Sequence, residues 1–111
     1  MKSTKAIILI PLTYNDGSRI AKGTLQGIFD EMFTVFHGWT IEGEVKGAYR
    51  METGEKRVEK LVRVAIVLER AELPILRRMV AKWCSLLGQE TMLLEITGSS
   101  VEFVPPRFEE D

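Results

Sequence analysis

The chain has 111 residues, of which 45% are hydrophobic and 28% charged, and its 15 Lys and Arg against 16 Asp and Glu give a net charge of −1. These values are typical of a globular protein of one domain, and without a basic excess they argue against nucleic acid as a partner. A single cysteine, Cys84, excludes an intramolecular disulfide and a thiolate metal cluster.

The basic N-terminus precedes a short apolar run that could be mistaken for a signal peptide. The run stops at Pro11 and is shorter than a typical signal sequence, and no other stretch approaches the length of a membrane span. We therefore expect a cytoplasmic protein that does not contact a membrane.

The first half of the chain predicts two strands around a helix. Residues 6–12 are apolar at nearly every position, which favours a central strand buried on both faces. Turn residues follow, and Asp16 or Ser18 is expected to cap a helix. That helix would bury Leu25, Ile28, Phe29, Met32 and Phe36 and end at His37-Gly38, with Gly38 in the left-handed position. Residues 39–50 then alternate between apolar and charged, which predicts a half-exposed strand with a bulge or a close approach at Gly43 and Gly47.

The second half predicts the same elements in the order strand, helix, strand. Residues 52–55 form a hairpin turn, and residues 58–68 read as a second central strand. Pro74 is expected in the first turn of a second helix, which has a buried apolar stripe and ends at Gly88. Residues 91–96 are predicted as the last strand, and residues 101–104 as a further short segment. The stripe consists of Leu73, Leu76, Val80, Trp83 and Leu87.

The element order is therefore βαββαβ, which predicts the α+β ferredoxin-like split fold, a four-stranded antiparallel sheet with both helices on one face. The usual strand order, 4-1-3-2, puts the two doubly apolar strands in the centre. We expect a single domain over residues 1–104 and a loose acidic tail over residues 105–111.

This topology brings the loop after the first strand beside the loop before the last strand. The loop edge formed in this way is a candidate binding site containing Tyr14, Asn15, Asp16, Gln89 and Glu90. Asp16 and Glu90 could together hold Mg²⁺ or act as acid and base. The alternative is that Asp16 only caps a helix and that Gln89 and Glu90 are solvated, and the capping and turn rules favour this alternative.

Other chemistry-bearing residues lack partners in the sequence. His37, the only histidine, is expected to interact with a helix dipole, and Cys84 to pack as a small apolar residue. No phosphate loop, metal-ligand pair or nucleophile elbow is present, so we predict neither a metal nor a cofactor.

Residues 88–95, Gly-Gln-Glu-Thr-Met-Leu-Leu-Glu, and residues 101–104 resemble the C-terminal part of small uncharacterised bacterial single-domain proteins with a Gly-Gln-Glu turn before the last strand. The resemblance covers about a quarter of the chain. It implies a ferredoxin-like fold and no catalytic residues. A fold-level analogy to small ferredoxin-like nucleases, which carry an acidic residue just after the first strand, rests on Asp16 alone.

In the first strand Ile7, Leu9 and Pro11 point one way and Ile8, Ile10 and Leu12 the other, so one of these two apolar sets would lie on the face that no helix covers. We therefore expect a homo-oligomer through the open sheet face, in the simplest case a sheet-to-sheet dimer. Two functional hypotheses stay open. The protein is either a non-catalytic binding or regulatory module that acts through its oligomeric sheet and polar loop edge, or a small metal-dependent enzyme, such as a phosphodiesterase or nuclease, that uses Asp16 and Glu90. The sequence names no small-molecule ligand for either.

Overall fold

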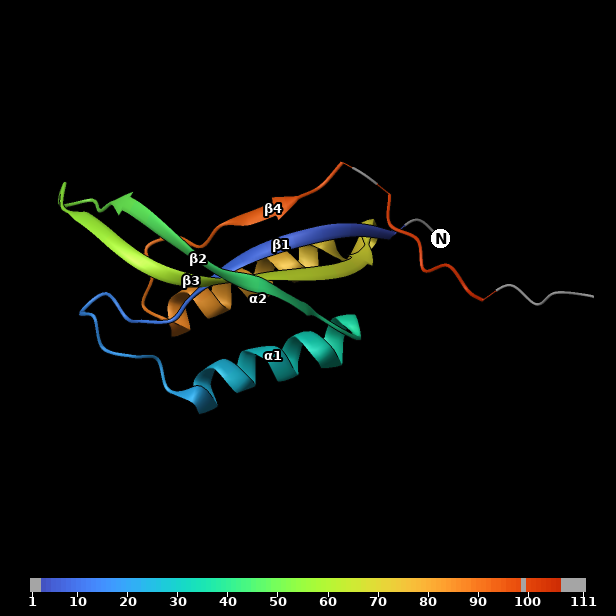
Figure 1. Ribbon diagram of the computed structural model, residues 1–111, viewed down its shortest axis with the longest axis horizontal. Coiled ribbons are helices and arrows are strands. Elements are labelled where there is room, and N and C mark those ends of the chain that lie inside the picture. Colours follow the sequence, from blue (N-terminus) through green and yellow to red (C-terminus); the bar gives the residue numbers. More distant parts are fainter. Residues whose placement is uncertain (1–2, 99, 107–111) are drawn as a thin grey trace, which may run out of the picture.

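A computed structural model describes residues 3–98 and 100–106 (Figure 1). The elements follow in the order β1 (Ser3–Pro11), α1 (Lys22–Phe36), β2 (Thr40–Arg50), β3 (Lys56–Glu69), a 3₁₀ turn (Arg70–Glu72), α2 (Leu73–Leu86) and β4 (Leu94–Ile96). The predicted βαββαβ order is confirmed.

The four strands form one antiparallel sheet in the order β2-β3-β1-β4. The architecture is therefore the ferredoxin-like α+β fold. β1 and β3 are central, and β1 pairs with β3 along the whole length of β1, from Ser3 opposite Glu69 to Pro11 opposite Leu61. Central strands meet neighbours on both edges, so their nearly continuous apolar sequence predicted their place correctly.

Both helices lie on one face of the sheet, where they enclose the core (Figure 1). Alternate residues of β1 and β3, among them Ile8, Ile10 and Ile66, point toward the helices and are fully buried. The predicted stripe of α2 is buried along its whole length, with Trp83 at its centre. Periodicity thus identified the inner side of α2 from the sequence alone.

The opposite face, called here the open face, is less bare than the sequence suggests. Ile7 and Ala65 are buried there although no helix covers them. Glu42 on β2 binds Lys5 at 2.8 Å and Arg63 at 2.9 Å, and the long stems of these side chains shield neighbouring apolar groups from water. The exposed apolar patch is therefore smaller than the strand sequences alone imply.

The ends of α1 differ from the sequence-based expectation. The helix begins at Lys22 after Ala21, whose side chain makes no cap, while Asp16 instead binds the hydroxyl and backbone N–H of Ser18 in a turn. At the other end His37, and not Gly38, takes the left-handed conformation with φ 69°, and its N–H binds the carbonyl oxygen of Phe33. Neither Asp16 nor Ser18 caps the helix because three residues separate Ser18 from the first helical turn.

The C-terminal region is less regular than predicted. β4 has three residues, and residues 91–93 before it are not a strand. Val101 makes one isolated bridge to Ser3, and the residues from 102 to 106 are exposed outside any strand. The predicted acidic tail lies mostly at residues 107–111, outside the described residues.

Candidate functional site

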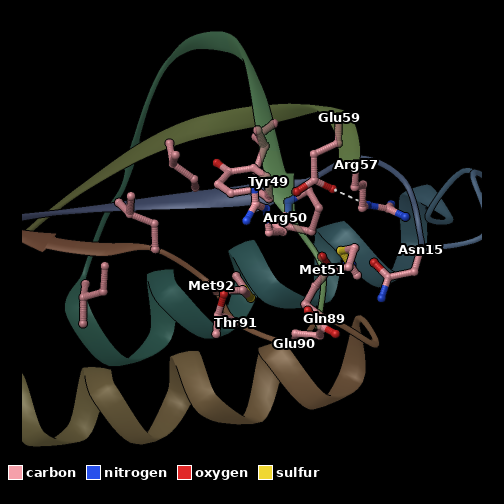
Figure 2. A pocket seen from close by; sticks show the side chains of 15 residues that line it. Asn15, Tyr49, Arg50, Met51, Arg57, Glu59, Gln89, Glu90, Thr91 and Met92 are labelled. Atoms are coloured by element: carbon pink, nitrogen blue, oxygen red, sulfur yellow. Dashed lines mark hydrogen bonds and ion pairs between the residues drawn. The ribbon is translucent and has the colours of Figure 1, made fainter. Parts of the chain in front are cut away.

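A pocket of about 420 Å³ opens at one end of the open face (Figure 2). Its walls come from β1 (Leu9, Pro11), from the end of β2 (residues 49–51), from β3 (Arg57, Glu59, Leu61) and from the segment that leads into β4 (residues 89–94), with Asn15 at one corner. The volume lies in the usual range for small-molecule sites, roughly 300–1,000 Å³. This sheet-face pocket is the strongest candidate for a binding site on the described part of the chain.

The sheet-face pocket contains a buried carboxylate. Glu59 is 9% exposed, and its Oε2 lies 3.2 Å from Nε of Arg57, two residues away on the same face of β3. Arg57 also donates to the backbone carbonyl oxygen of Tyr14. A buried carboxylate is costly unless it is paired, so Arg57 both compensates Glu59 and ties β3 to the loop after β1.

Tyr49 forms the wall beside Glu59 because Gly47 leaves room for its ring. Gly47 pairs with Glu59 across the strands, and a Cβ built on Gly47 would lie only 2.7 Å from the Tyr49 ring. The close approach at Gly47 expected from the sequence is therefore made by a side chain and not by a helix. In Figure 2 the Glu59 carboxylate lies between Tyr49 and Arg57. At Gly43 the expected bulge is present, with φ +128° and a register shift.

Three of the five residues of the predicted loop edge lie in this pocket. Asn15, Gln89 and Glu90 line it, and Asn15 Nδ2 donates to the carbonyl oxygen of Gly88 at 2.9 Å. Oε1 of Glu90 accepts a longer bond of 3.4 Å from the backbone N–H of Glu52, which links the hairpin turn to this edge. The topology argument thus placed these segments together.

Tyr14 and Asp16 do not line the pocket. The side chain of Tyr14 packs against the core, and only its backbone oxygen meets Arg57. Asp16 is exposed, and the hydrogen bonds from the Ser18 hydroxyl and then from the Ser18 N–H lower its pKa below the usual value. Asp16 is therefore a turn residue that stays ionised.

The metal-dependent alternative gains no support from this geometry. Among residues 3–98 and 100–106, no three His, Cys, Asp or Glu side chains form a group that could hold a metal ion. The other residues singled out in the sequence have local roles. Cys84 donates from Sγ to the carbonyl oxygen of Gln89 at 3.3 Å, and His37 ends α1.

Sequence reasoning missed the residues that give the pocket its character, namely Tyr49, Arg57 and Glu59. Residues 55–60 are mostly charged, so Glu59 looked like one more solvated strand residue. The signal available was Gly47, which the β2–β3 register places opposite Glu59 and which removes the side chain that would otherwise cover it. That register is set by the hairpin turn, because the pairs run without a shift from Arg50–Lys56 through Gly47–Glu59, and the shift at Gly43 comes only farther along β2.

The fold and this pocket define a small ferredoxin-like domain with a small-molecule-sized cavity on its open face. No protein-family profile matches the chain, and no curated protein sequence matches it. Among solved structures the chain is similar to a phage SAM lyase in complex with S-methyl-5′-thioadenosine, with a TM-score of 0.66 over 96% of this chain and 93% of the lyase chain. The two sequences are 13% identical, so the likeness shows a shared fold. No helix of the described residues combines the length and the apolar character needed to span a membrane.

Proposed function

We propose that the sheet-face pocket binds a small adenosyl–sulfur compound, either a thioether such as S-methyl-5′-thioadenosine or the related sulfonium S-adenosylmethionine (SAM). The observation that carries this proposal is the pocket itself, which combines apolar walls with the buried carboxylate of Glu59. The phage SAM lyase, which has the same fold, holds S-methyl-5′-thioadenosine. That protein supplies the ligand class, and the chemistry of the pocket supplies the fit.

The two kinds of wall suit the two parts of such a ligand. Leu9, Met92 and Leu93 offer apolar surface for a ribosyl thioether, and the Tyr49 ring can contact a base or a methyl group. A sulfonium is a cation, and a carboxylate attracts it. The attraction is stronger in a partly water-excluded wall than in bulk water, because the local dielectric constant is lower. Arg57 already neutralises part of the Glu59 charge, so we expect this preference for the cation to be modest.

Calorimetry and thermal melting with S-methyl-5′-thioadenosine, SAM and adenosine test the proposal. A ligand that binds only the native chain raises the melting temperature, by the equivalent of about 2.7 kcal/mol at one hundred times Kd. Glu59→Gln should weaken SAM more than the neutral thioether, whereas Glu55→Gln on the exposed hairpin turn should change neither. Absence of binding by both sulfur compounds at millimolar concentration would refute the proposal.

The same samples distinguish a binding module from an enzyme. Chromatography of SAM incubated with the chain shows whether S-methyl-5′-thioadenosine is released. Release that depends on Glu59 would make the chain an enzyme that cleaves SAM, with the four-carbon amino-acid fragment appearing in equal amount: a fragment formed without added water identifies a lyase, and one that has gained water a hydrolase. Binding without release would leave a binding or regulatory module.

We also propose a homo-oligomer through the open face and a cytoplasmic location. Support for the oligomer comes from Tyr49 and Leu93, which are 39% and 46% exposed at the rim of the pocket, and from Leu9, which is half-buried beside them. Light scattering at high micromolar concentration checks this, and a strict monomer would contradict it. Leu93→Lys should shift the equilibrium toward the monomer, while Val58→Lys, on the opposite side of the hairpin, should not.

A further inference from the structure

One end of the sheet-face pocket contains two amide side chains whose oxygens accept no hydrogen bond from the described residues. Asn15 Nδ2 donates to the carbonyl oxygen of Gly88 at 2.9 Å, and Gln89 Nε2 donates to that of Leu87 at 3.0 Å. A carbonyl oxygen only accepts, so these partners fix the orientation of both amides and leave Asn15 Oδ1 and Gln89 Oε1 for other contacts. Neither oxygen accepts a hydrogen bond from the described residues.

Glu90 adds a third acceptor and a negative charge to this end. Its Oε1 takes only the 3.4 Å bond from the Glu52 N–H, which is long for a hydrogen bond, and its Oε2 has no partner among the described residues. The Thr91 hydroxyl and the second N–H of each amide are the donors at this end, and the cationic donors of the pocket lie elsewhere. Arg57 is engaged by Glu59 and Tyr14, and Arg50 lies beside Tyr49 on the β2 wall (Figure 2).

We propose that this acceptor end, formed by Asn15, Gln89 and Glu90, binds an amino group of the ligand. The inference deepens the proposed function and rests on it. The Glu90 carboxylate cannot donate, so together with the two amide oxygens it favours an N–H group and disfavours a carbonyl at the same position, because two acceptors facing each other leave both unsatisfied. An adenosyl–sulfur ligand offers two such groups, the exocyclic amine of its adenine and, when an amino-acid chain is present, an ammonium.

Calorimetry with three probes distinguishes these two sources. S-methyl-5′-thioadenosine carries only the adenine amine, its inosine counterpart replaces that amine with a carbonyl, and S-adenosylhomocysteine adds the ammonium. If the adenine amine binds at this end, the inosine compound binds the wild type at least about tenfold more weakly than the adenosine compound. Loss of a charge-assisted hydrogen bond likewise weakens the affinity about tenfold or more. If the ammonium binds there, Glu90→Gln therefore weakens S-adenosylhomocysteine about tenfold and leaves S-methyl-5′-thioadenosine unchanged.

Glu52→Gln is the matched control, since Glu52 is a neighbouring exposed carboxylate that does not line the pocket. Thermal melting checks that both variants fold, and Gln at position 90 keeps an acceptor for the Glu52 N–H. Equal binding of the adenosine and inosine compounds, together with unchanged S-adenosylhomocysteine binding in Glu90→Gln, overturns this inference and leaves the proposed function standing. A wild-type chain that binds none of the three probes overturns both.

Discussion

At the scale of single residues, Glu31 on α1 links the two helices through polar contacts to α2. Its Oε1 accepts from Nε1 of Trp83 at 3.2 Å, and its Oε2 binds Nζ of Lys82 at 2.5 Å. Trp83 is completely buried, so its indole N–H needs this partner. The hydrogen bond from Lys82, more than that from Trp83, lowers the pKa of Glu31 below its usual value, against the opposing effect of burial.

We predict that Glu31→Ala lowers the free energy of unfolding by about 1–2 kcal/mol, because the buried indole N–H loses its acceptor. Glu31→Gln keeps an acceptor and should cost less, since the exposed Lys82 pair contributes little. Urea titrations at pH 7 measure both.

The pH dependence follows from the sign of the pKa shift. A carboxyl with a lowered native pKa stabilises the fold above its unfolded pKa and loses that contribution as the pH falls through the native value. The stability difference between the wild type and Glu31→Gln should therefore shrink below about pH 4.5. A difference that grew in acid would contradict this role.

Gly47 determines where the Tyr49 ring can lie. We predict that Gly47→Ala displaces the ring from the pocket wall, because the new Cβ would lie 2.7 Å from it, and that ligand binding weakens severalfold. Tyr49 is 39% exposed and can rotate outward, so the free energy of unfolding should change by less than about 1 kcal/mol. Calorimetry and urea titration measure the two effects, and unchanged binding would show that the ring does not contact the ligand.

At the scale of elements, α1 contains two glycines that lower its stability and that could be replaced. Gly23 and Gly27 lie on its exposed side, and a Cβ at either position would meet nothing within 4 Å. No neighbouring segment of the described chain approaches either glycine closely.

We predict that Gly27→Ala raises the free energy of unfolding by about 0.5–1 kcal/mol, the usual gain from replacing glycine in a helix. Gly43→Ala is the contrasting control, because φ +128° strains any residue with a Cβ, and it should destabilise the chain. Urea unfolding measures both. A destabilising Gly27→Ala would indicate that another molecule covers this side of α1.

The elements show how far the sequence reaches. Periodicity predicted α2, and doubly apolar runs predicted that β1 and β3 lie at the centre of the sheet. Both predictions succeeded because the pattern of buried residues can be read within one segment, without knowing its neighbours. Residues 91–93 were wrongly predicted as strand, since an apolar run does not show whether its backbone pairs or lines a cavity. The pocket itself was only half predictable. Adjacent loop ends follow from topology, whereas the burial of Glu59 depends on a register between two strands.

At the scale of the whole molecule, the β2–β3 hairpin extends beyond both helices (Figure 1). The described chain measures 66 × 26 × 22 Å. Residues at the hairpin end, such as Ala48 and Val58, are exposed although they pair in the sheet, so little apolar burial stabilises this region.

We predict that amides around Ala48 and Val58 exchange with solvent much faster than those of Ile8 and Val64 at the sheet centre, because the hairpin end opens locally. Hydrogen exchange followed by mass spectrometry measures this. Added S-methyl-5′-thioadenosine should slow exchange at residues 49–51, 57 and 59, which line the pocket, and leave residues 53–55 at the turn unchanged. Uniform exchange across β3 would contradict a locally opening hairpin.

The pairing of β1 with β4 also determines when the sheet can form fully during synthesis. β1 precedes β2, β3 and both helices in the chain, yet one of its edges is closed by the three residues of β4, which follow all of them. Until then that edge of an almost entirely apolar strand is unpaired, a state in which nascent chains are open to association with one another. The pocket also cannot form until then, because residues 89–94 make up one of its walls. A ribosome-bound chain that has not released these residues therefore lacks one wall of its binding site.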